Sequence, residues 1–161
     1  MEFYENLETH YDRMTRFKER IKTEKSVLTK WVERYKFQSA LDVACGTGLH
    51  SILLAQMGIK TTGVDISENM LKQARLHGEE FKGEVTWILS SMEELNSNLR
   101  EKYDAIFCLG NSIPHILDVP SLDKTFKNFY EVLNPGGILV IQLLNYKKIY
   151  DTKNRIVGIH R

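Results

Sequence analysis

The sequence has little of what several protein classes require. Its 161 residues include only two cysteines, Cys45 and Cys108, which are too few for a disulfide framework and match no metal-binding spacing. No apolar run approaches the ~20 residues of a transmembrane helix, and residues 1–5 lack the apolar stretch of a secretory signal. The formal net charge is only +1, so no basic surface indicates a nucleic-acid partner. We therefore expect a cytoplasmic protein that binds neither membranes nor nucleic acid.

What is present is ordinary for one globular domain. Hydrophobic residues make up 42% of the chain and charged residues 27%, which is typical of a folded protein. A chain of this length can bury a substantial core. We find no internal repeat and no low-complexity segment, so residues 1–161 are expected to form a single domain, with residues 1–36 as an N-terminal helical cap.

Short apolar segments alternate with helical patterns after residue 36. Strands are predicted at residues 39–44, 61–65, 85–89, 104–109 and 138–143. Helices are predicted at residues 51–57, after an N-cap at Ser67, and from Ser121 onward, and residues 134–137 (NPGG) are predicted to turn the chain. Continuously apolar strands are typical of parallel sheets covered on both faces. With right-handed crossovers, the fold class is α/β: a Rossmann-like, doubly wound and mostly parallel sheet in the order 3-2-1-4-5, with helices on both faces.

This strand order predicts where a ligand binds. Open α/β sheets hold ligands beyond the carboxyl ends of their strands, at the point where the winding direction reverses. Here that point lies between strands one and four, next to residues 44–48 and 110–114. Cys45 and Cys108 are then expected to lie close together as small buried thiols.

The run at residues 40–48 (ALDVACGTG) joins a strand to a glycine-rich loop. Residues 46–51 nearly match the dinucleotide fingerprint G-x-G-x-x-G/A, and Asp65 follows at close to the ~20 residues expected for an acid that binds a ribose. This pattern alone is compatible with an NAD-dependent oxidoreductase. Asp42, however, would repel a pyrophosphate, whereas a ligand with a sulfonium and an amino group would tolerate it. No residues for hydride transfer stand out downstream, so the oxidoreductase remains a distant alternative.

Several motifs together resemble a known family. They are residues 41–48 (LDVACGTG), 64–71 (VDISENML), 108–112 (CLGNS), 134–137 (NPGG) and 145–146 (NY). In this combination the chain resembles class I S-adenosylmethionine-dependent methyltransferases, in particular the glycine and glycine/sarcosine N-methyltransferases. The resemblance spans residues 16–147. It implies S-adenosylmethionine as the cofactor, with S-adenosylhomocysteine as the product, and it is much less specific for the methyl acceptor.

The resemblance also implies which residues bind the cofactor. Asp65 would hold both ribose hydroxyls, Arg20 would bind the carboxylate of the methionine part, and Ile66 and Met70 would flank the adenine. The complete set that the resemblance implies is Arg20, Asp42, Ala44, Cys45, Gly46, Gly48, Asp65, Ile66, Met70, Ser91, Met92 and Leu109.

The acceptor is expected to be a small molecule that is methylated directly on an amine nitrogen. The resemblance places Asn111 and Tyr146 near the reacting groups, and His115, in the loop after the fourth strand, is a further candidate for contact with substrate. Alignment of the acceptor with the methyl group is the main requirement of the reaction. Leu144 stands where the glycine-methylating branch has an arginine for the substrate carboxylate, which favours a less anionic or bulkier amine.

The chain also resembles only the first part of such enzymes. Residues 155–159 are expected to begin a sixth strand, and the remaining C-terminal strands are expected to be missing. The alternative to an active enzyme is therefore a truncated fragment that binds the cofactor without turnover. The apolar edge of the fifth strand would be open, which favours a homo-oligomer formed through that edge.

Overall fold

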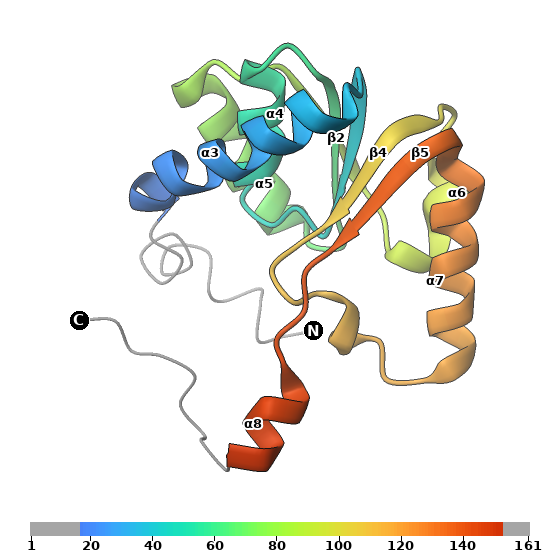
Figure 1. Ribbon diagram of the computed structural model, residues 1–161. Coiled ribbons are helices and arrows are strands. Elements are labelled where there is room, and N and C mark those ends of the chain that lie inside the picture. Colours follow the sequence, from blue (N-terminus) through green and yellow to red (C-terminus); the bar gives the residue numbers. More distant parts are fainter. Residues whose placement is uncertain (1–16, 153–161) are drawn as a thin grey trace.

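The computed structural model describes residues 17–152. The part of the predicted N-terminal helical cap at residues 1–16 and the strand predicted at residues 155–159 lie outside the described residues. The described part contains a five-stranded sheet in which every pairing is parallel and the order is β3-β2-β1-β4-β5 (Figure 1). The predicted fold class and strand order are therefore confirmed. The strands are β1 (Ser39–Val43), β2 (Lys60–Asp65), β3 (Val85–Leu89), β4 (Tyr103–Cys108) and β5 (Leu133–Ile141).

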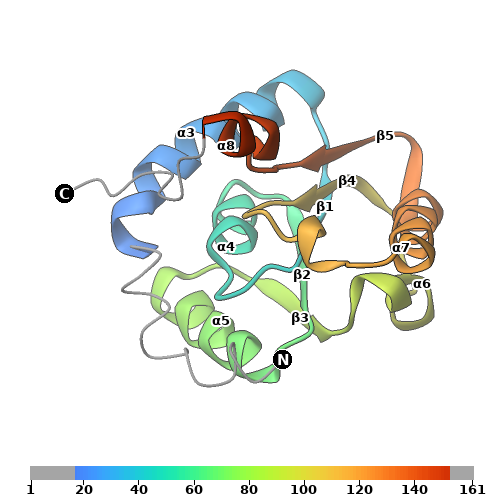
Figure 2. The same cartoon turned by 90° about the horizontal axis from the view of Figure 1, so that it is seen from below.

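Helices cover both faces of the sheet. Figure 2 shows α3, α4 and α5 on one side and α6 and α7 on the other. Because α4 follows β1 and α5 follows β2 as the chain moves toward one edge, right-handed crossovers place both on the same face. The bounds are α3 (Phe17–Tyr35), α4 (Leu49–Gln56), α5 (Glu68–Phe81), α6 (Leu95–Asn98), α7 (Val119–Val132) and α8 (Tyr146–Thr152).

The strand β4 shows how both faces are buried. Phe107 points toward α3, where its ring stacks on Trp31 with centroids 5.7 Å apart. Its neighbours Ile106 and Cys108 point to the opposite face and pack in the same cluster as Phe129 of α7. Side chains alternate between faces along a strand, so a strand covered on both sides must be apolar throughout. This explains the continuous apolar run in the sequence.

The ends of the helices differ from the predictions at two places. The helix α4 begins at Leu49, two residues early, because Gly48 takes a left-handed conformation (φ +86°) and caps it. The helix α7 begins at Val119 rather than at Ser121, because the Asp118 side chain accepts a hydrogen bond from the Ser121 N–H and is the true N-cap. The predicted cap of α5 is confirmed, since Ser67 Oγ accepts from the N–H of Met70.

The predicted turn at residues 134–137 is instead a bulge inside β5. Tyr103 pairs with Leu133 and Ala105 with Ile138, so β5 contains more residues than β4 over this stretch. Gly136 takes a positive φ of 80° there. The strand consequently begins directly at the end of α7, at Leu133, and ends at Ile141 rather than at residue 143.

Four short elements were not predicted. They are the 3-10 helices η1 (Met92–Glu94) and η2 (Ile113–His115) and the helices α6 and α8. Between residues 17 and 152, no helix is long and apolar enough to cross a membrane.

Candidate active site

The loop after β1 bends sharply at the carboxyl edge of the sheet. Ala44, Gly46 and Gly48 all have positive φ values, of 56°, 55° and 86°. Glycine adopts this region freely, whereas the side chain of Ala44 makes it unfavourable there. The Gly48 N–H donates to the carbonyl of Cys45, which closes the turn before α4 begins. Strained backbone of this kind is typical of functional loops.

Asp65, at the end of β2, holds this loop in place. Its Oδ2 accepts from the Gly46 N–H at 2.8 Å and its Oδ1 from the Ser67 N–H at 2.9 Å. Burial raises the pKa of the Asp65 carboxyl, and the backbone donors partly offset that effect. Each carboxylate oxygen keeps a lone pair that can accept a further hydrogen bond. The carboxylate therefore fixes the glycine loop and still has capacity for two hydroxyl groups.

Asp42 lies beneath the loop. Its side chain is fully buried, and Oδ2 accepts from Ser51 Oγ, in the first part of α4, at 2.6 Å. Burial raises the pKa of the Asp42 carboxyl. Asp42 does not line the cavity described next, so the structure places it as a support for the start of α4.

A small cavity opens between the loop, α3 and the loop after β4. Its volume is about 70 Å³, well below the ~300–1,000 Å³ of sites that enclose a drug-sized ligand. It brings together five of the predicted cofactor residues, from distant parts of the sequence. They are Arg20, Ala44, Cys45, Gly46 and Leu109, and the other lining residues are Phe17, Thr47, Leu49, His50, Gly110 and Ser112.

Arg20 is held at this cavity by a side-chain network that sequence reasoning missed. Its Nε and Nη2 donate to Glu24 Oε1 at 3.2 and 3.0 Å. Glu24 Oε2 lies 3.3 Å from Nε2 of His50, which must be the donor because a carboxylate can only accept. The hydrogen bonds from His50 and Arg20 lower the pKa of Glu24 to about 2. The i, i+4 spacing of Arg20 and Glu24 on a helix was the available sequence pattern.

Both cysteines, the half-buried Cys45 and the buried Cys108, have raised pKa values. Burial, with the charge of Asp42 as a further cause, raises the pKa of Cys108 to about 12. The same two causes raise the pKa of Cys45 well above its usual range. Thiolates are the reactive form of cysteine, so these raised pKa values disfavour either residue as a nucleophile. The charge of Asp42 raises the pKa of both thiols. Cys108 is the last residue of β4 and Cys45 lies just after the adjacent strand β1.

The residues predicted to surround an adenine are not equivalent. Ile66 is 60% exposed at the end of β2 and is free to cover a flat ring, whereas Met70 is 3% exposed. Ser91 and Met92 lie half-buried at the start of η1. None of these four lines the small cavity. Leu89, exposed at the end of β3, is a neighbouring apolar surface that the sequence patterns did not single out.

The structure joins Asn111 and Tyr146 directly. Asn111 Nδ2 donates to the Tyr146 hydroxyl at 2.6 Å, and Asn111 Oδ1 accepts from the Leu144 N–H at 3.1 Å. A second link, from the Gly110 N–H to Gln142 Oε1 at 3.0 Å, ties the same two chain segments together. The polar ends of Asn111 thus hold the segment after β5. His115, by contrast, is exposed in η2 and does not line the cavity.

These features define a doubly wound α/β domain whose strained glycine loop and small cavity lie at its switch point. The comparisons with known proteins are specific about the family. Residues 40–137 match the family model described as a methyltransferase domain. The chain belongs to this family, the S-adenosylmethionine-dependent methyltransferases, as the sequence motifs implied. This membership favours the methyl-donor interpretation over the oxidoreductase.

Three similar proteins illustrate the match. The chain is 34% identical over 143 residues to a glycine/sarcosine/dimethylglycine N-methyltransferase of Actinopolyspora halophila, covering 88% of this chain and 25% of that protein. It is 37% identical over 123 residues to a glycine N-methyltransferase of Rattus norvegicus, covering 70% and 42%. A crystal structure of an S-adenosylmethionine-dependent methyltransferase from Clostridium acetobutylicum superimposes with a TM-score of 0.77 at 25% identity, covering 92% and 61%. The chain therefore spans about half or less of the length of these two curated relatives.

Proposed function

We propose that this protein binds S-adenosylmethionine at the carboxyl ends of β1, β2 and β4 and transfers its methyl group to an amine nitrogen of a small molecule. The observation that carries the proposal is the strained loop of Ala44, Gly46 and Gly48, which Asp65 ties to β2 beside a cavity lined by Arg20. The similarity to N-methyltransferases that act on glycine and sarcosine supports an amine acceptor.

The residues present fit such a cofactor. The guanidinium of Arg20 can pair with its carboxylate, and the Asp65 carboxylate can accept from its ribose hydroxyls. The cavity of about 70 Å³ has room for the amino-acid end only. The nucleoside would then lie over the ends of β2 and β3, against Ile66. The cofactor supplies a methyl group on a sulfonium, which needs no acid to leave.

The acceptor would bind next to the Asn111–Tyr146 pair. Because the Tyr146 oxygen accepts from Asn111, its own hydrogen and one lone pair remain available for an amine. The protein's role is to align a neutral nitrogen lone pair with the methyl–sulfur bond, and such alignment can supply ~7–11 kcal/mol. Leu144, 45% exposed, and Leu143 make this surface apolar. An uncharged or apolar amine fits it better than one with a carboxylate at that position.

Calorimetry with separate ligands tests the cofactor part of the proposal. S-adenosylhomocysteine should bind and NAD should not. The Asp65→Ala substitution should weaken S-adenosylhomocysteine binding at least about tenfold, because it removes charge-assisted hydrogen bonds. Glu101→Gln, which changes an exposed carboxylate paired with Lys60, is the control and should bind normally. Binding of NAD alone, or an unchanged affinity in Asp65→Ala, would contradict the proposed site.

A second candidate is a fragment that binds the cofactor without turnover. The exposure of Tyr146 and Leu144 favours it, because a methyl-transfer site is expected to exclude water. Incubation with cofactor labelled in its methyl group and a panel of small amines separates the two functions. Label in an amine product supports the methyltransferase, whereas cofactor binding without any labelled product supports the fragment.

A further inference from the structure

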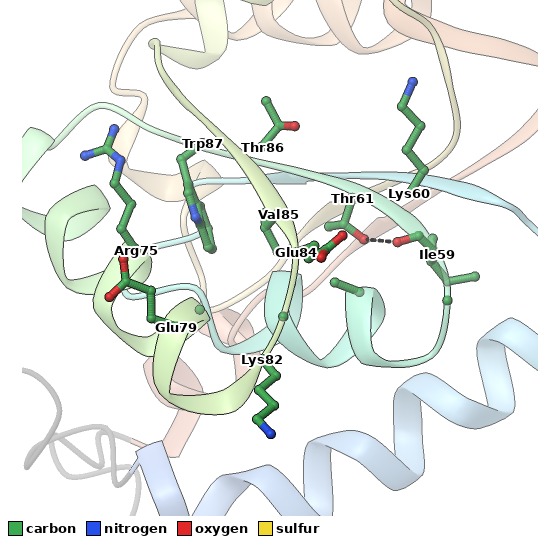
Figure 3. A pocket seen from close by; sticks show the side chains of 14 residues that line it. Ile59, Lys60, Thr61, Arg75, Glu79, Lys82, Glu84, Val85, Thr86 and Trp87 are labelled. Carbon is green, nitrogen blue, oxygen red and sulfur yellow. Dashed lines mark hydrogen bonds between the residues drawn. The ribbon is translucent and has the colours of Figure 1, made fainter.

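The indole of Trp87 packs against the glycine loop at Gly48 and is not among the residues that line the small cavity. Trp87 belongs to the edge strand β3 and pairs in register with Gly63 of β2. Figure 3 shows its ring extending from β3 toward the helices, in a hollow of about 950 Å³ that Arg75 and Glu79 of α5 also line. This hollow does not include the residues that line the small cavity.

Two glycines leave room for this ring, and a third lies at ordinary contact distance from it. A Cβ atom on Gly48 would lie 2.5 Å from Cη2 of Trp87, and one on Gly63 would lie 2.5 Å from Cζ3. A Cβ atom on Gly78 of α5 would be 3.8 Å from Cζ2. The benzene part of the indole therefore rests directly on the backbone of Gly48 and Gly63. Contacts this close exist only because those positions carry no side chain.

Gly48 transmits this contact to the cofactor loop. Its N–H donates to the Cys45 carbonyl and its carbonyl accepts from the Ile52 N–H, so it belongs both to the loop and to the first turn of α4. The helix α5 supports the same loop, since His77 Nδ1 donates to the Thr47 carbonyl at 3.0 Å. Cys45 and Thr47 line the small cavity. A shift of the indole would therefore move backbone that lines the site.

We propose that Trp87 is a positioning residue for cofactor binding, because its indole fixes the backbone of Gly48 and through it the shape of the glycine loop. This inference rests on the proposed cofactor site. Trp87 itself is not among the residues that line the cavity. Its effect is indirect, so an aromatic ring that keeps part of this packing should preserve part of the effect, and a smaller, flexible side chain should preserve less.

Calorimetric titration of S-adenosylhomocysteine into three variants tests the inference. W87L should raise the dissociation constant roughly five- to tenfold, within the range of indirect couplings. W87F should raise it by a smaller factor, because a phenyl ring fills the inner part of the indole position but is too short to reach Gly48. W31L is the matched control, because Trp31 is the other tryptophan and stacks on Phe107 in the core. Thermal unfolding should show that all three variants are folded at the titration temperature. The inference fails if W87L binds normally or if W31L loses as much affinity as W87L.

A double-mutant cycle with Gly63 provides a second measurement. G63A places a methyl group against the Trp87 ring, where the nearest other atom is Ser51 Oγ at 3.0 Å. It should weaken S-adenosylhomocysteine binding in the wild-type background and much less in the W87L background. Additive effects of the two substitutions would overturn the inference. If the wild-type chain binds no S-adenosylhomocysteine at all, the proposed function fails first, which is a distinct result.

Discussion

Three carboxylates near the glycine loop behave differently because their surroundings differ. Asp42 is the second-last residue of β1 and Asp65 the last residue of β2, and burial raises the pKa of both. Glu24 lies on α3, where the hydrogen bonds from His50 and Arg20 lower its pKa to about 2. A buried carboxylate without a cationic partner is costly. Burial therefore disfavours the charged form of both aspartates near the loop, and a cationic ligand bound beside them would offset part of that cost.

The Arg20→Ala substitution should separate the two ends of the proposed cofactor. We expect S-adenosylhomocysteine to bind about tenfold more weakly, since a charge-assisted hydrogen bond to its carboxylate is lost. Methylthioadenosine, which lacks that carboxylate, should bind this variant and the wild type alike. Calorimetry with both ligands checks the prediction. An equal loss for both ligands would assign Arg20 a role in the shape of the site instead.

The Asp42→Asn substitution should change the pH dependence of stability. The folded-state pKa of Asp42 is raised, so the folded protein favours the protonated form. The favourable contribution is complete below the unfolded value near 3.8 and is lost as the pH rises through the folded value. Asparagine stays neutral and can still accept from Ser51. Without ligand, the variant should unfold at a higher temperature than the wild type at pH 7, and the difference should vanish near pH 3.8 in calorimetric scans. A variant less stable than the wild type at pH 7 would contradict this reasoning.

At the scale of elements, one carboxylate joins three strands. Oδ2 of Asp104, near the start of β4, accepts from the Gln38 N–H, the Ser39 N–H and Ser39 Oγ, each at 3.0 Å, where β1 begins. Its Oδ1 accepts from Asn134 Nδ2, in the bulge of β5, at 2.8 Å. The hydrogen bond from Asn134 and the backbone donor of Gln38 lower the pKa of Asp104. This junction lies at the amino ends of the strands, opposite the glycine loop.

The Asp104→Ala substitution should therefore lower stability and leave ligand binding unchanged. Loss of hydrogen bonds to this half-buried charged group costs about 1 kcal/mol, or about 2–4 °C in Tm for a domain of this size. The lowered pKa means that the stabilisation is present above the unfolded value of 3.8 and is lost as the pH falls below it. The wild type should thus lose its advantage over the variant in acid. A weaker affinity for S-adenosylhomocysteine in this variant would show coupling between the two ends of the sheet.

The sheet was predictable from the sequence because its causes are local and repeated. Apolar segments covered on both faces and right-handed crossovers fix the order of the strands. The starts of helices were less predictable, since Asp118 and Ser121 are both good N-caps and only the backbone geometry selects one. The residues NPGG were interpreted as a turn because Pro and Gly usually make one. In the fold, Leu133 pairs with Tyr103 and Ile138 with Ala105, so the residues NPGG between them form a bulge within β5.

At the scale of the whole molecule, the site also contains one part that the sequence predicts and another part that it does not. The glycine loop and Asp65 follow from short sequence patterns, because backbone conformation and strand ends set them. The contacts that hold the loop and its surroundings do not follow from such patterns. Glu24 pairs with His50, Trp87 packs on Gly48, and Asn111 donates a hydrogen bond to Tyr146. Each pair joins residues that are far apart in the sequence. Only the tertiary fold brings them together.

The outer edge of β5 provides a prediction about association. Within the described residues, β5 pairs only with β4, so its other edge presents unpaired backbone groups. Leu139 is 37% exposed along that strand, and Leu143 and Leu144 continue the apolar surface beyond it. Open apolar edges favour pairing with another chain. We expect this chain to self-associate through β5 as its concentration rises.

Leu139→Lys tests this association, because a charge on an edge strand opposes strand pairing. Sedimentation velocity over a wide concentration range should show the wild type shifting to larger species and Leu139→Lys remaining monomeric. Leu117→Lys is the matched control, since Leu117 is 92% exposed outside the sheet, and it should associate like the wild type. If the wild type stays monomeric at every concentration, the edge does not pair. If both lysine variants lose association equally, net charge rather than strand pairing controls it.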